Sequence, residues 1–180
     1  VVLITGGSRG LGLEIARILA AEGAYVSLVA RNSSTLEVAR RELDEIGHRT
    51  LIVPCDIRNQ KEVERAVRET AESFGRLDVL INNAGVIQVG PFESMNLQDY
   101  QLAMETHAWG SLYSMLAAIP YMRNRGGGRV VNIVSIGGKI AVPHLAPYVM
   151  SKFAQAGLSE ALGAELAAED IFVTTVYPGL

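Results

Sequence analysis

The chain has 180 residues, of which 49% are hydrophobic and 19% charged, and this composition describes a globular domain rather than a disordered spacer. Sixteen Lys and Arg against nineteen Asp and Glu leave a formal charge of -3, which argues against a protein that binds nucleic acid through its phosphates. The single cysteine, Cys55, excludes an internal disulfide and favours a reducing, cytoplasmic location. No apolar run of the sequence approaches the length of about 18 residues that spans a membrane.

Both ends of the sequence lie next to apolar runs. Val1 already belongs to such a run, and Pro178, Gly179 and Leu180 come directly after another. A chain of this length corresponds to one domain. We therefore expect a single domain over residues 1–180 that is incomplete at both ends.

Short, mostly apolar runs alternate with longer amphipathic segments from the first residue to the last. The expected strands are Val1–Thr5, Tyr25–Val29, Thr50–Pro54, Val79–Asn82, Arg129–Val134 and Ile171–Tyr177. The expected helices are Leu11–Glu22, Thr35–Ile46, Lys61–Phe74, Leu97–Asn124 and Pro147–Glu169. Glycines mark the expected helix ends at Gly23, Gly47, Gly75 and Gly126–Gly128. Repeated strand–helix–strand units with right-handed crossovers predict an α/β fold, a doubly wound parallel sheet with helices on both faces. The segment Leu97–Asn124 is long for one helix, and we expect it to be kinked or broken near Gly110.

A glycine-rich loop, Thr5–Gly12, joins the first expected strand to the first expected helix. Gly6 permits a tight turn, Gly10 lets the backbone approach a pyrophosphate, and Gly12 allows close packing of helix and strand. The helix start then offers free N–H groups to the phosphates. The loop predicts a dinucleotide site, and the alternative is a glycine-rich turn that binds nothing.

The residue type at the end of the second strand distinguishes the two nicotinamide dinucleotides. An acidic residue at this position binds the ribose 2′-hydroxyl of NAD. Here the strand runs into Ala30, Arg31, Asn32 and Ser33, with no acid. The Arg31 guanidinium suits a 2′-phosphate, and Arg9 of the first loop can reach the same group. The pair favours NADP over NAD, whereas the alternative for Arg31 is a solvated surface charge.

Tyr148 and Lys152 are four residues apart and therefore share one face of the last expected helix. A phenol loses its proton near pH 10, but a neighbouring ammonium favours the phenolate and makes the tyrosine a usable general acid/base at neutral pH. Ser135 ends the fifth expected strand, at the sheet edge where α/β proteins bind ligands, and its hydroxyl can hold a substrate oxygen. The alternative for Ser135 is a cap between strand and loop.

Taken together, these residues resemble the short-chain dehydrogenase/reductase family over essentially the whole chain. The motifs that carry the resemblance are Thr5–Gly12, Asp56, Asn82-Asn83-Ala84-Gly85, Ser135, Tyr148, Lys152 and Pro178-Gly179. The resemblance implies a Rossmann fold and an NADP-dependent oxidoreductase that interconverts a carbonyl and a secondary alcohol. It assigns proton transfer to Tyr148 and substrate binding to Ser135. Lys152 would lower the pKa of Tyr148 and bind the hydroxyls of the nicotinamide ribose. The cofactor residues that it implies are Gly6, Ser8, Arg9, Gly10, Leu11, Gly12, Arg31, Asp56 (at the adenine), Ile57, Asn83, Ala84, Gly85, Tyr148, Lys152, Pro178 and Gly179.

Two departures from the family pattern concern the proton relay and the end of the chain. The family carries an asparagine in an Asn-x-x-Gly context behind the lysine, and His107 takes that position here. The imidazole either replaces the relay and makes it pH-dependent, as a catalytic residue, or bonds a backbone carbonyl at a helix break. Family members also continue past Pro-Gly into a substrate-covering segment, so the sequence does not name the substrate.

The remaining candidates have structural explanations. His48 and His144 lack partners at metal-ligand spacing, so no metal site is expected, and Cys55 is expected as a small buried residue. We expect Arg123, Arg125 and Arg129 to form a solvated face. An apolar stripe on the long expected helix predicts core packing and a contact between subunits of a homo-oligomer. The stripe consists of Tyr113, Met115, Leu116, Ile119 and Met122.

Two rival functions are a non-catalytic NADP-binding sensor or scaffold and an epimerase or dehydratase acting on nucleotide-linked sugars. The combination of Ser135, Tyr148 and Lys152 argues against the first rival, and the three-residue gap between Gly6 and Gly10 argues against the second.

Overall fold

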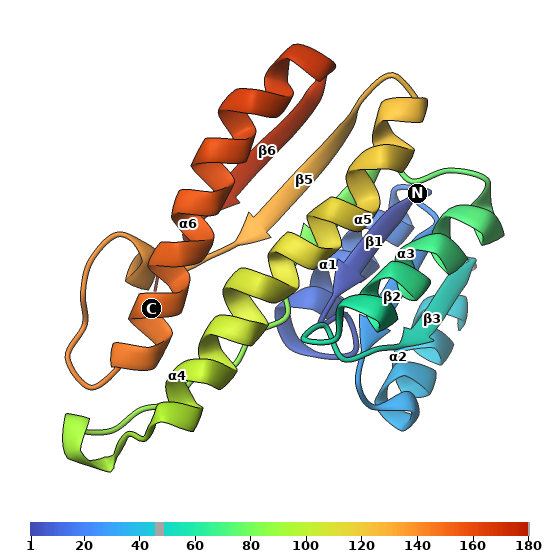
Figure 1. The fold of residues 1–180 in the computed structure, drawn as a ribbon. Coiled ribbons are helices and arrows are strands. Elements are labelled where there is room, and N and C mark those ends of the chain that lie inside the picture. The colour runs from blue at the N-terminus through green and yellow to red at the C-terminus, as the bar shows by residue number, and fades with distance from the viewer. Residues whose placement is uncertain (46–48, 180) are drawn as a thin grey trace.

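The strands form one parallel sheet in the order β3-β2-β1-β4-β5-β6 in the computed structural model, which describes residues 1–45 and 49–179 (Figure 1). Their bounds are Val2–Thr5 for β1, Val26–Ala30 for β2, Thr50–Pro54 for β3, Val79–Asn82 for β4, Gly128–Ile133 for β5 and Ile171–Val176 for β6. This order confirms the predicted doubly wound parallel sheet. From β1 the chain adds β2 and β3 on one side of the sheet, and then crosses over to add β4, β5 and β6 on the other side. Doubly wound sheets bind ligands at this crossover point, which lies between β1 and β4.

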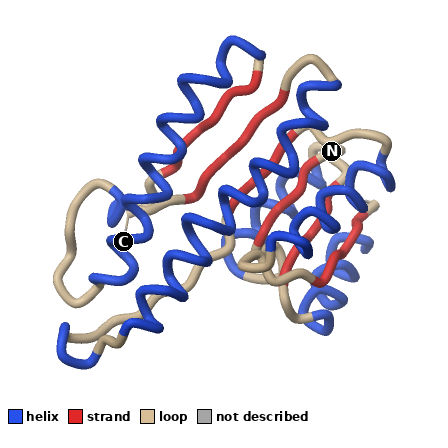
Figure 2. Tube along the Cα trace, in the orientation of Figure 1, coloured by secondary structure: helices blue, strands red, loops and turns tan. Residues whose placement is uncertain are grey.

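Helices connect successive strands and cover both faces of the sheet, as the tube in Figure 2 shows. Their bounds are Gly10–Ala21 for α1, Ser33–Glu45 for α2, Gln60–Phe74 for α3, Leu97–Met104 for α4, Gly110–Asn124 for α5 and Ala146–Leu166 for α6. Helices α1 and α2 lie behind the sheet in Figure 1, whereas α3, α5 and α6 lie in front of it. The expected end of the second helix at Ile46 and its stop at Gly47 lie outside the described residues, as does His48.

Alternating strand residues supply two separate cores, one under each helix layer. Leu3 of β1 and Leu80 of β4 pack with α3 and α5, whereas Ile4 and Ile81 pack with α1 and α2. Successive side chains of a strand point to opposite faces, so a strand buried on both sides must be apolar throughout. This is why the strands read as continuous apolar runs in the sequence.

The long segment Leu97–Asn124 is interrupted just before Gly110, as the sequence predicted. A π-helical turn, Glu105–Trp109, separates α4 from α5 and carries His107. Turns of this kind frequently occur at functional sites. Gly110 packs closely on the loop after β3, since a Cβ there would lie 2.8 Å from Cδ1 and 3.2 Å from the carbonyl oxygen of Ile57. In the part of the chain that the structure describes, no helix is both long and apolar enough to cross a membrane.

Candidate active site

A cleft of about 550 Å³ opens beyond the carboxyl ends of β1, β2, β3 and β4. It therefore lies at the reversal of strand order, the usual ligand site of a doubly wound sheet. Many of the predicted cofactor residues line it: Gly6, Ser8, Arg9, Gly10, Arg31, Asp56, Ile57, Asn83, Ala84 and Gly85. Four residues that were not predicted from the sequence line the same cleft: Asn32, Thr35, Arg58 and Thr106.

The three glycines of the first loop have different roles, and the structure separates them. Gly6 has φ +67 and Gly10 has φ +56, a left-handed conformation that side chains disfavour. A Cβ on Gly10 would meet nothing within 4 Å, so it would stand in the open cleft. A Cβ on Gly12, in contrast, would lie 2.5 Å from Nδ2 of Asn83. Gly10 thus leaves room for a ligand, whereas Gly12 allows the start of α1 to pack against the loop after β4.

Hydrogen bonds tie the glycine loop to the end of β4. The side-chain amide of Asn83 donates to the carbonyl oxygens of Thr5 at 3.0 Å and Gly6 at 3.2 Å. In return, Oγ1 of Thr5 accepts the backbone N–H groups of Asn83 at 3.0 Å and Ala84 at 3.2 Å. These reciprocal bonds fix the two loops that form the floor of the cleft. The N-terminal N–H groups of α1 have no side-chain cap and remain available to an anion.

Two predicted arginines, Arg9 and Arg31, line the cleft together with Asn32 and Thr35. Neither arginine forms an ion pair with a carboxylate of residues 1–45 or 49–179. Oδ1 of Asn32 accepts the N–H groups of Ser34 at 2.9 Å and Thr35 at 3.2 Å, which fixes the start of α2. This end of the cleft therefore offers positive charge beside a rigid helix start, and the charge of Arg31 also helps to lower the pKa of Asp56.

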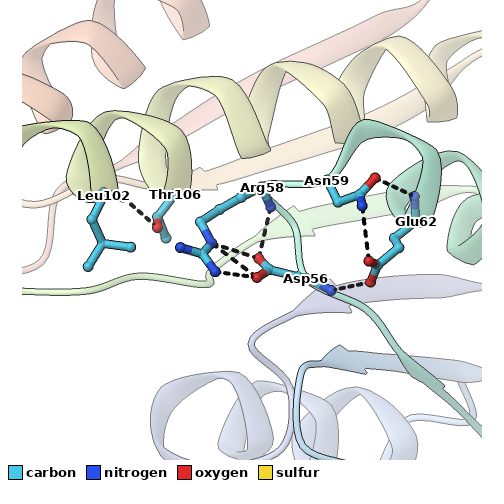
Figure 3. A network of polar contacts seen from close by, with 6 residues as sticks. All are labelled: Asp56, Arg58, Asn59, Glu62, Leu102 and Thr106. Carbon is cyan, nitrogen blue, oxygen red and sulfur yellow. Dashed lines mark hydrogen bonds and ion pairs between the residues drawn. The ribbon is translucent and has the colours of Figure 1, made fainter. Parts of the chain in front are cut away.

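Asp56, the residue that the family pattern places at the adenine, is held by a third arginine (Figure 3). Nε of Arg58 lies 3.0 Å from both carboxylate oxygens of Asp56, and Nη2 lies 2.5 Å from Oδ2. The side-chain bond from Arg58, ahead of its backbone bond and charge, lowers the pKa of Asp56 below its ordinary value. Glu62 at the start of α3 accepts the Asp56 N–H at 2.8 Å, so the loop after β3 is held from two sides.

Figure 3 also shows Thr106, which the π-helical turn brings to the same cleft. Its hydroxyl donates to the carbonyl oxygen of Leu102 at 2.7 Å. Nothing in its sequence context distinguishes this threonine from an ordinary helical residue. Its place in the cleft depends on the packing of the turn, which the sequence does not reveal.

Ser135 and Tyr148 come together around Gly137, in the 3₁₀ turn Ile136–Gly138 that follows β5. A Cβ on Gly137 would lie 3.2 Å from Cε1 of Tyr148 and 3.5 Å from Oγ of Ser135. Oγ of Ser135 accepts the Gly137 N–H at 3.1 Å, so the serine also caps the turn. Within residues 1–45 and 49–179 this hydroxyl donates to no acceptor, so its hydrogen can reach a ligand. The carbonyl oxygen of Pro178 accepts the Ile136 N–H at 2.9 Å, which brings the predicted Pro178 beside this turn.

Lys152 is almost fully buried, with 4% of its surface exposed. Its Nζ donates to the carbonyl oxygen of Ile133 at 2.8 Å and to Oε1 of Gln155 at 2.9 Å. The same Nζ lies 5.8 Å from the centre of the Tyr148 ring, so the predicted pair does share one helix face. Burial lowers the pKa of Lys152 from 10.5 to about 7.

His107 is fully buried between the loop after β4 and the start of α6. Nε2 accepts the Val86 N–H at 3.1 Å, and Nδ1 lies 2.7 Å from Oγ of Ser151, whose hydroxyl donates to the Tyr148 carbonyl oxygen at 2.7 Å. These partners require a neutral ring with its proton on Nδ1. Burial, followed by the charge of Lys152, lowers the pKa of His107 to about 3. Burial therefore disfavours a charged His107 near neutral pH, and the backbone partner of His107 is an N–H rather than the carbonyl of the alternative interpretation.

The structure supports the interpretation of Cys55 as a small buried residue. Cys55 is 2% exposed, and burial raises the pKa of its thiol to about 12. A thiol in this state is inert as a nucleophile. Among the described residues, no group of three or more His, Cys, Asp and Glu side chains is placed to hold a metal ion.

A family model described as short chain dehydrogenase matches residues 1–180. The chain belongs to the short-chain dehydrogenase family. It is 40% identical over 181 residues to a putative ketoacyl reductase of Streptomyces coelicolor, covering 99% of this chain and 69% of that protein. It is 39% identical over 182 residues to 11-beta-hydroxysteroid dehydrogenase-like 3 of Arabidopsis thaliana, covering 100% of this chain and 58% of the relative.

Solved structures of the family superpose closely on this short-chain dehydrogenase. An NAD⁺-bound xylitol dehydrogenase matches with a TM-score of 0.96 and 30% identity, over 99% of this chain and 69% of that one. A putative short-chain alcohol dehydrogenase from Sinorhizobium meliloti 1021 matches with a TM-score of 0.94 and 34% identity. The match covers 99% of this chain and 71% of that one. The chain thus spans between about three fifths and seven tenths of the length of these proteins.

Most of the predicted residues of this short-chain dehydrogenase belong to one of two groups in the structure. One group lines the cleft, and the other lies near the 3₁₀ turn after β5 and the start of α6. Some predicted residues do not line the cleft: Leu11, Gly12, His107, Ser135, Tyr148, Lys152, Pro178 and Gly179. Of these, Leu11 is half exposed and Gly12 packs beneath the loop.

Proposed function

We propose that this short-chain dehydrogenase transfers a hydride between NADP(H) and a carbonyl or secondary alcohol, with Tyr148 exchanging the proton. One observation carries the proposal: a buried Lys152 stands beside the Tyr148 ring, and Tyr148 and Ser135 meet around Gly137. A binding module has no use for a buried lysine, a phenol and a free hydroxyl at one strand end. An oxidoreductase uses all three.

The cleft fits a dinucleotide in shape and in charge. The open space beside Gly10 accommodates a pyrophosphate, and the uncapped N-terminus of α1 offers it N–H donors. Asp56 and the loop that contains Asn83 would hold the adenosine, and Pro178 would lie near the nicotinamide. When bound, the nicotinamide supplies or accepts the hydride, while the protein provides position and proton transfer.

The protein groups around the substrate have complementary roles. The Ser135 hydroxyl donates to the substrate oxygen, and in the direction of reduction the Tyr148 hydroxyl gives that oxygen its proton. The Lys152 ammonium favours the phenolate that results, because opposite charges stabilise each other in a buried site. His107, as a neutral ring, holds the start of α6 through Ser151 rather than passing protons.

Arg9 and Arg31 support NADP as the cofactor. Both line the cleft, and neither forms an ion pair with a carboxylate of the described ranges. A 2′-phosphate carries close to two negative charges, which suits two guanidinium groups. No acidic side chain follows β2 to select the ribose hydroxyl of NAD, although one structural neighbour is an NAD⁺-bound enzyme.

We also propose a cytoplasmic homo-oligomer that handles small molecules. Met115, Ile119 and Met122 of the apolar stripe are buried in the core of this chain, whereas Leu116 is 56% exposed on the outer face of α5. The exposed part of the stripe, with Trp109 48% exposed before it, supports a contact with a second copy. The names of the relatives, a ketoacyl reductase and a hydroxysteroid dehydrogenase, suggest the substrates with which to begin.

The test is oxidation of NADPH and of NADH by the protein, expressed at its natural full length, against a panel of β-ketoacyl esters, ketosteroids and simple ketones. We expect turnover of at least one carbonyl and faster turnover with NADPH. Faster turnover with NADH would overturn the argument from Arg9 and Arg31. Tight NADPH binding without turnover of any panel member would favour the rival function, a cofactor-binding sensor or scaffold.

A further inference from the structure

Gln155, one turn beyond Lys152 on α6, is a buried polar residue for which the proposed reaction gives no role. It is 1% exposed, and its Oε1 accepts from Nζ of Lys152 at 2.9 Å. Its Nε2 donates to Oγ of Ser111 at 2.8 Å, and Ser111 is 3% exposed on α5. A continuous buried chain of hydrogen bonds therefore leads from the ammonium on α6 to a hydroxyl on α5.

The chemistry of the ammonium fixes the direction of this chain. An ammonium has three donors and no acceptor, so Gln155 must turn its oxygen toward Lys152. The amide nitrogen then faces Ser111, whose hydroxyl accepts. The carbonyl oxygen of Ile133 takes a second ammonium hydrogen at 2.8 Å. Two of the three donors of Lys152 are thus bound by the protein, and the third remains for Tyr148 or a ligand.

A second set of buried bonds fixes the backbone of Gln155 against the sheet. Ser159 Oγ donates to the Gln155 carbonyl oxygen at 2.7 Å and accepts from Nδ2 of Asn132 at 2.8 Å. Oδ1 of Asn132 accepts from Asn82 at 2.8 Å. Strands β4 and β5 thereby hold the turn of α6 that carries Gln155, so its side chain is aimed at Lys152 by contacts of its own.

The surroundings of Lys152 otherwise disfavour its charge. His107 from the π-helical turn, whose pKa is lowered by burial, and Tyr148 from α6 are the titratable groups that face it, and neither is an acidic counter-ion. Strand β5 contributes the neutral carbonyl of Ile133, and α5 contributes Ser111 through Gln155. Within residues 1–45 and 49–179, Lys152 pairs with no carboxylate. A buried charge without a counter-ion depends on its hydrogen-bond acceptors.

We propose that Gln155 is a positioning residue that keeps Lys152 protonated and directed toward Tyr148, and that Ser111 orients Gln155 for this task. The proposal rests on the proposed function, in which a charged Lys152 supports proton transfer by Tyr148. It concerns only the protonation and placement of the lysine, so it can be tested without turnover.

The test is a pH titration of Lys152 by NMR with ¹³Cε-labelled lysine in the full-length protein. Exposed Lys61 and Lys139 act as internal references, and the Lys152 signal is assigned by its loss in Lys152→Arg. Gln155→Leu removes the acceptor, and we expect the midpoint of Lys152 to fall by about one to two pH units, because a hydrogen bond to a charged group has that strength. Gln155→Glu places a carboxylate at the same site and should raise the midpoint above that of the parent protein.

Ser111→Ala is the second arm and keeps the test open if Gln155→Leu fails to fold. We expect a smaller fall of the Lys152 midpoint than in Gln155→Leu. Ser114→Ala is its matched control, since Ser114 is a buried serine of α5 that donates only to its own helix, to Gly110 at 2.8 Å, and it should leave the midpoint unchanged. Unchanged midpoints in both Gln155 variants, or equal shifts in Ser111→Ala and Ser114→Ala, would overturn the proposal.

Turnover measurements separate failure of this inference from failure of the proposed function. If the function is right, the pH profile of kcat should shift in the same direction as the Lys152 midpoint in each Gln155 variant, with little change in the KM for the carbonyl. An active parent protein with a fixed Lys152 midpoint would overturn the inference alone. A parent protein without turnover, but with the expected NMR shifts, would overturn the proposed function alone.

Discussion

Replacing Arg31 with alanine should weaken binding of NADPH and leave binding of NADH nearly unchanged. Arg31 lines the cleft at the end of β2, and its charge is not taken up by an ion pair with any carboxylate of the described residues. A hydrogen bond to a charged group contributes about 1.5 to 3 kcal/mol. Because about 1.4 kcal/mol corresponds to a tenfold change in affinity, the Kd for NADPH should rise by about ten-fold to 150-fold.

The assay is a fluorescence titration of each reduced cofactor into the parent protein, Arg31→Ala and Arg68→Ala. Arg68 is an exposed arginine of α3 outside the cleft, so its removal changes the net charge equally without touching the site. We expect Arg68→Ala to bind both cofactors as the parent does. Adding Arg9→Ala to Arg31→Ala should weaken NADPH binding further. Equal weakening of NADPH and NADH in Arg31→Ala, or no change in either, would refute the assignment of Arg31 to a 2′-phosphate.

Two further predictions concern stability and the loop. His107 has a folded pKa of about 3, below its ordinary value of 6.5, so between these values the unfolded chain binds the extra proton and acid destabilises the fold. Urea unfolding of the parent should lose about 1.4 kcal/mol per pH unit more than His107→Asn over this range, and equal losses would show that His107 is not held neutral. Gly12→Ala should lower the free energy of unfolding by about 1 to 3 kcal/mol, because its methyl group would collide with Asn83. Gly10→Ala should weaken NADPH binding, since its methyl group stands in the open cleft, and should also cost some stability because Gly10 is left-handed at φ +56. A loss of NADPH affinity in Gly12→Ala with none in Gly10→Ala would contradict these roles.

The fold was predictable because it depends on patterns that lie close together in the sequence. Strands buried on both faces are apolar throughout, so β1 and β4 were predicted as Val1–Thr5 and Val79–Asn82 without any knowledge of their neighbours, and the structure begins β1 at Val2. The turn at Gly6 and the change in the long helix near Gly110 were predictable from the local sequence as well. The parallel sheet with helices on both faces follows from the alternation of strands and helices, because right-handed crossovers leave few other arrangements.

The site was predictable where a motif carries it and not where distant contacts decide it. Tyr148 and Lys152 share a helix face by spacing alone, but the partner of Gln155 lies 44 positions away on another helix. Arg58 follows Asp56 closely, yet a loop sequence does not show which way its guanidinium turns. The protonation of His107 depends on burial, which is a property of the folded molecule and does not follow from the ordinary pKa of an imidazole.

The most direct test of the proposed function is turnover by Tyr148→Phe in the full-length protein, with the NADPH Kd measured on the same preparation. The phenylalanine keeps the ring that packs against Gly137 and removes only the hydroxyl. General acid/base catalysis contributes about 10²- to 10⁴-fold to a rate, so kcat should fall by at least that factor while the Kd for NADPH is unchanged. Turnover at the parental rate in Tyr148→Phe would contradict the assignment of proton transfer to Tyr148.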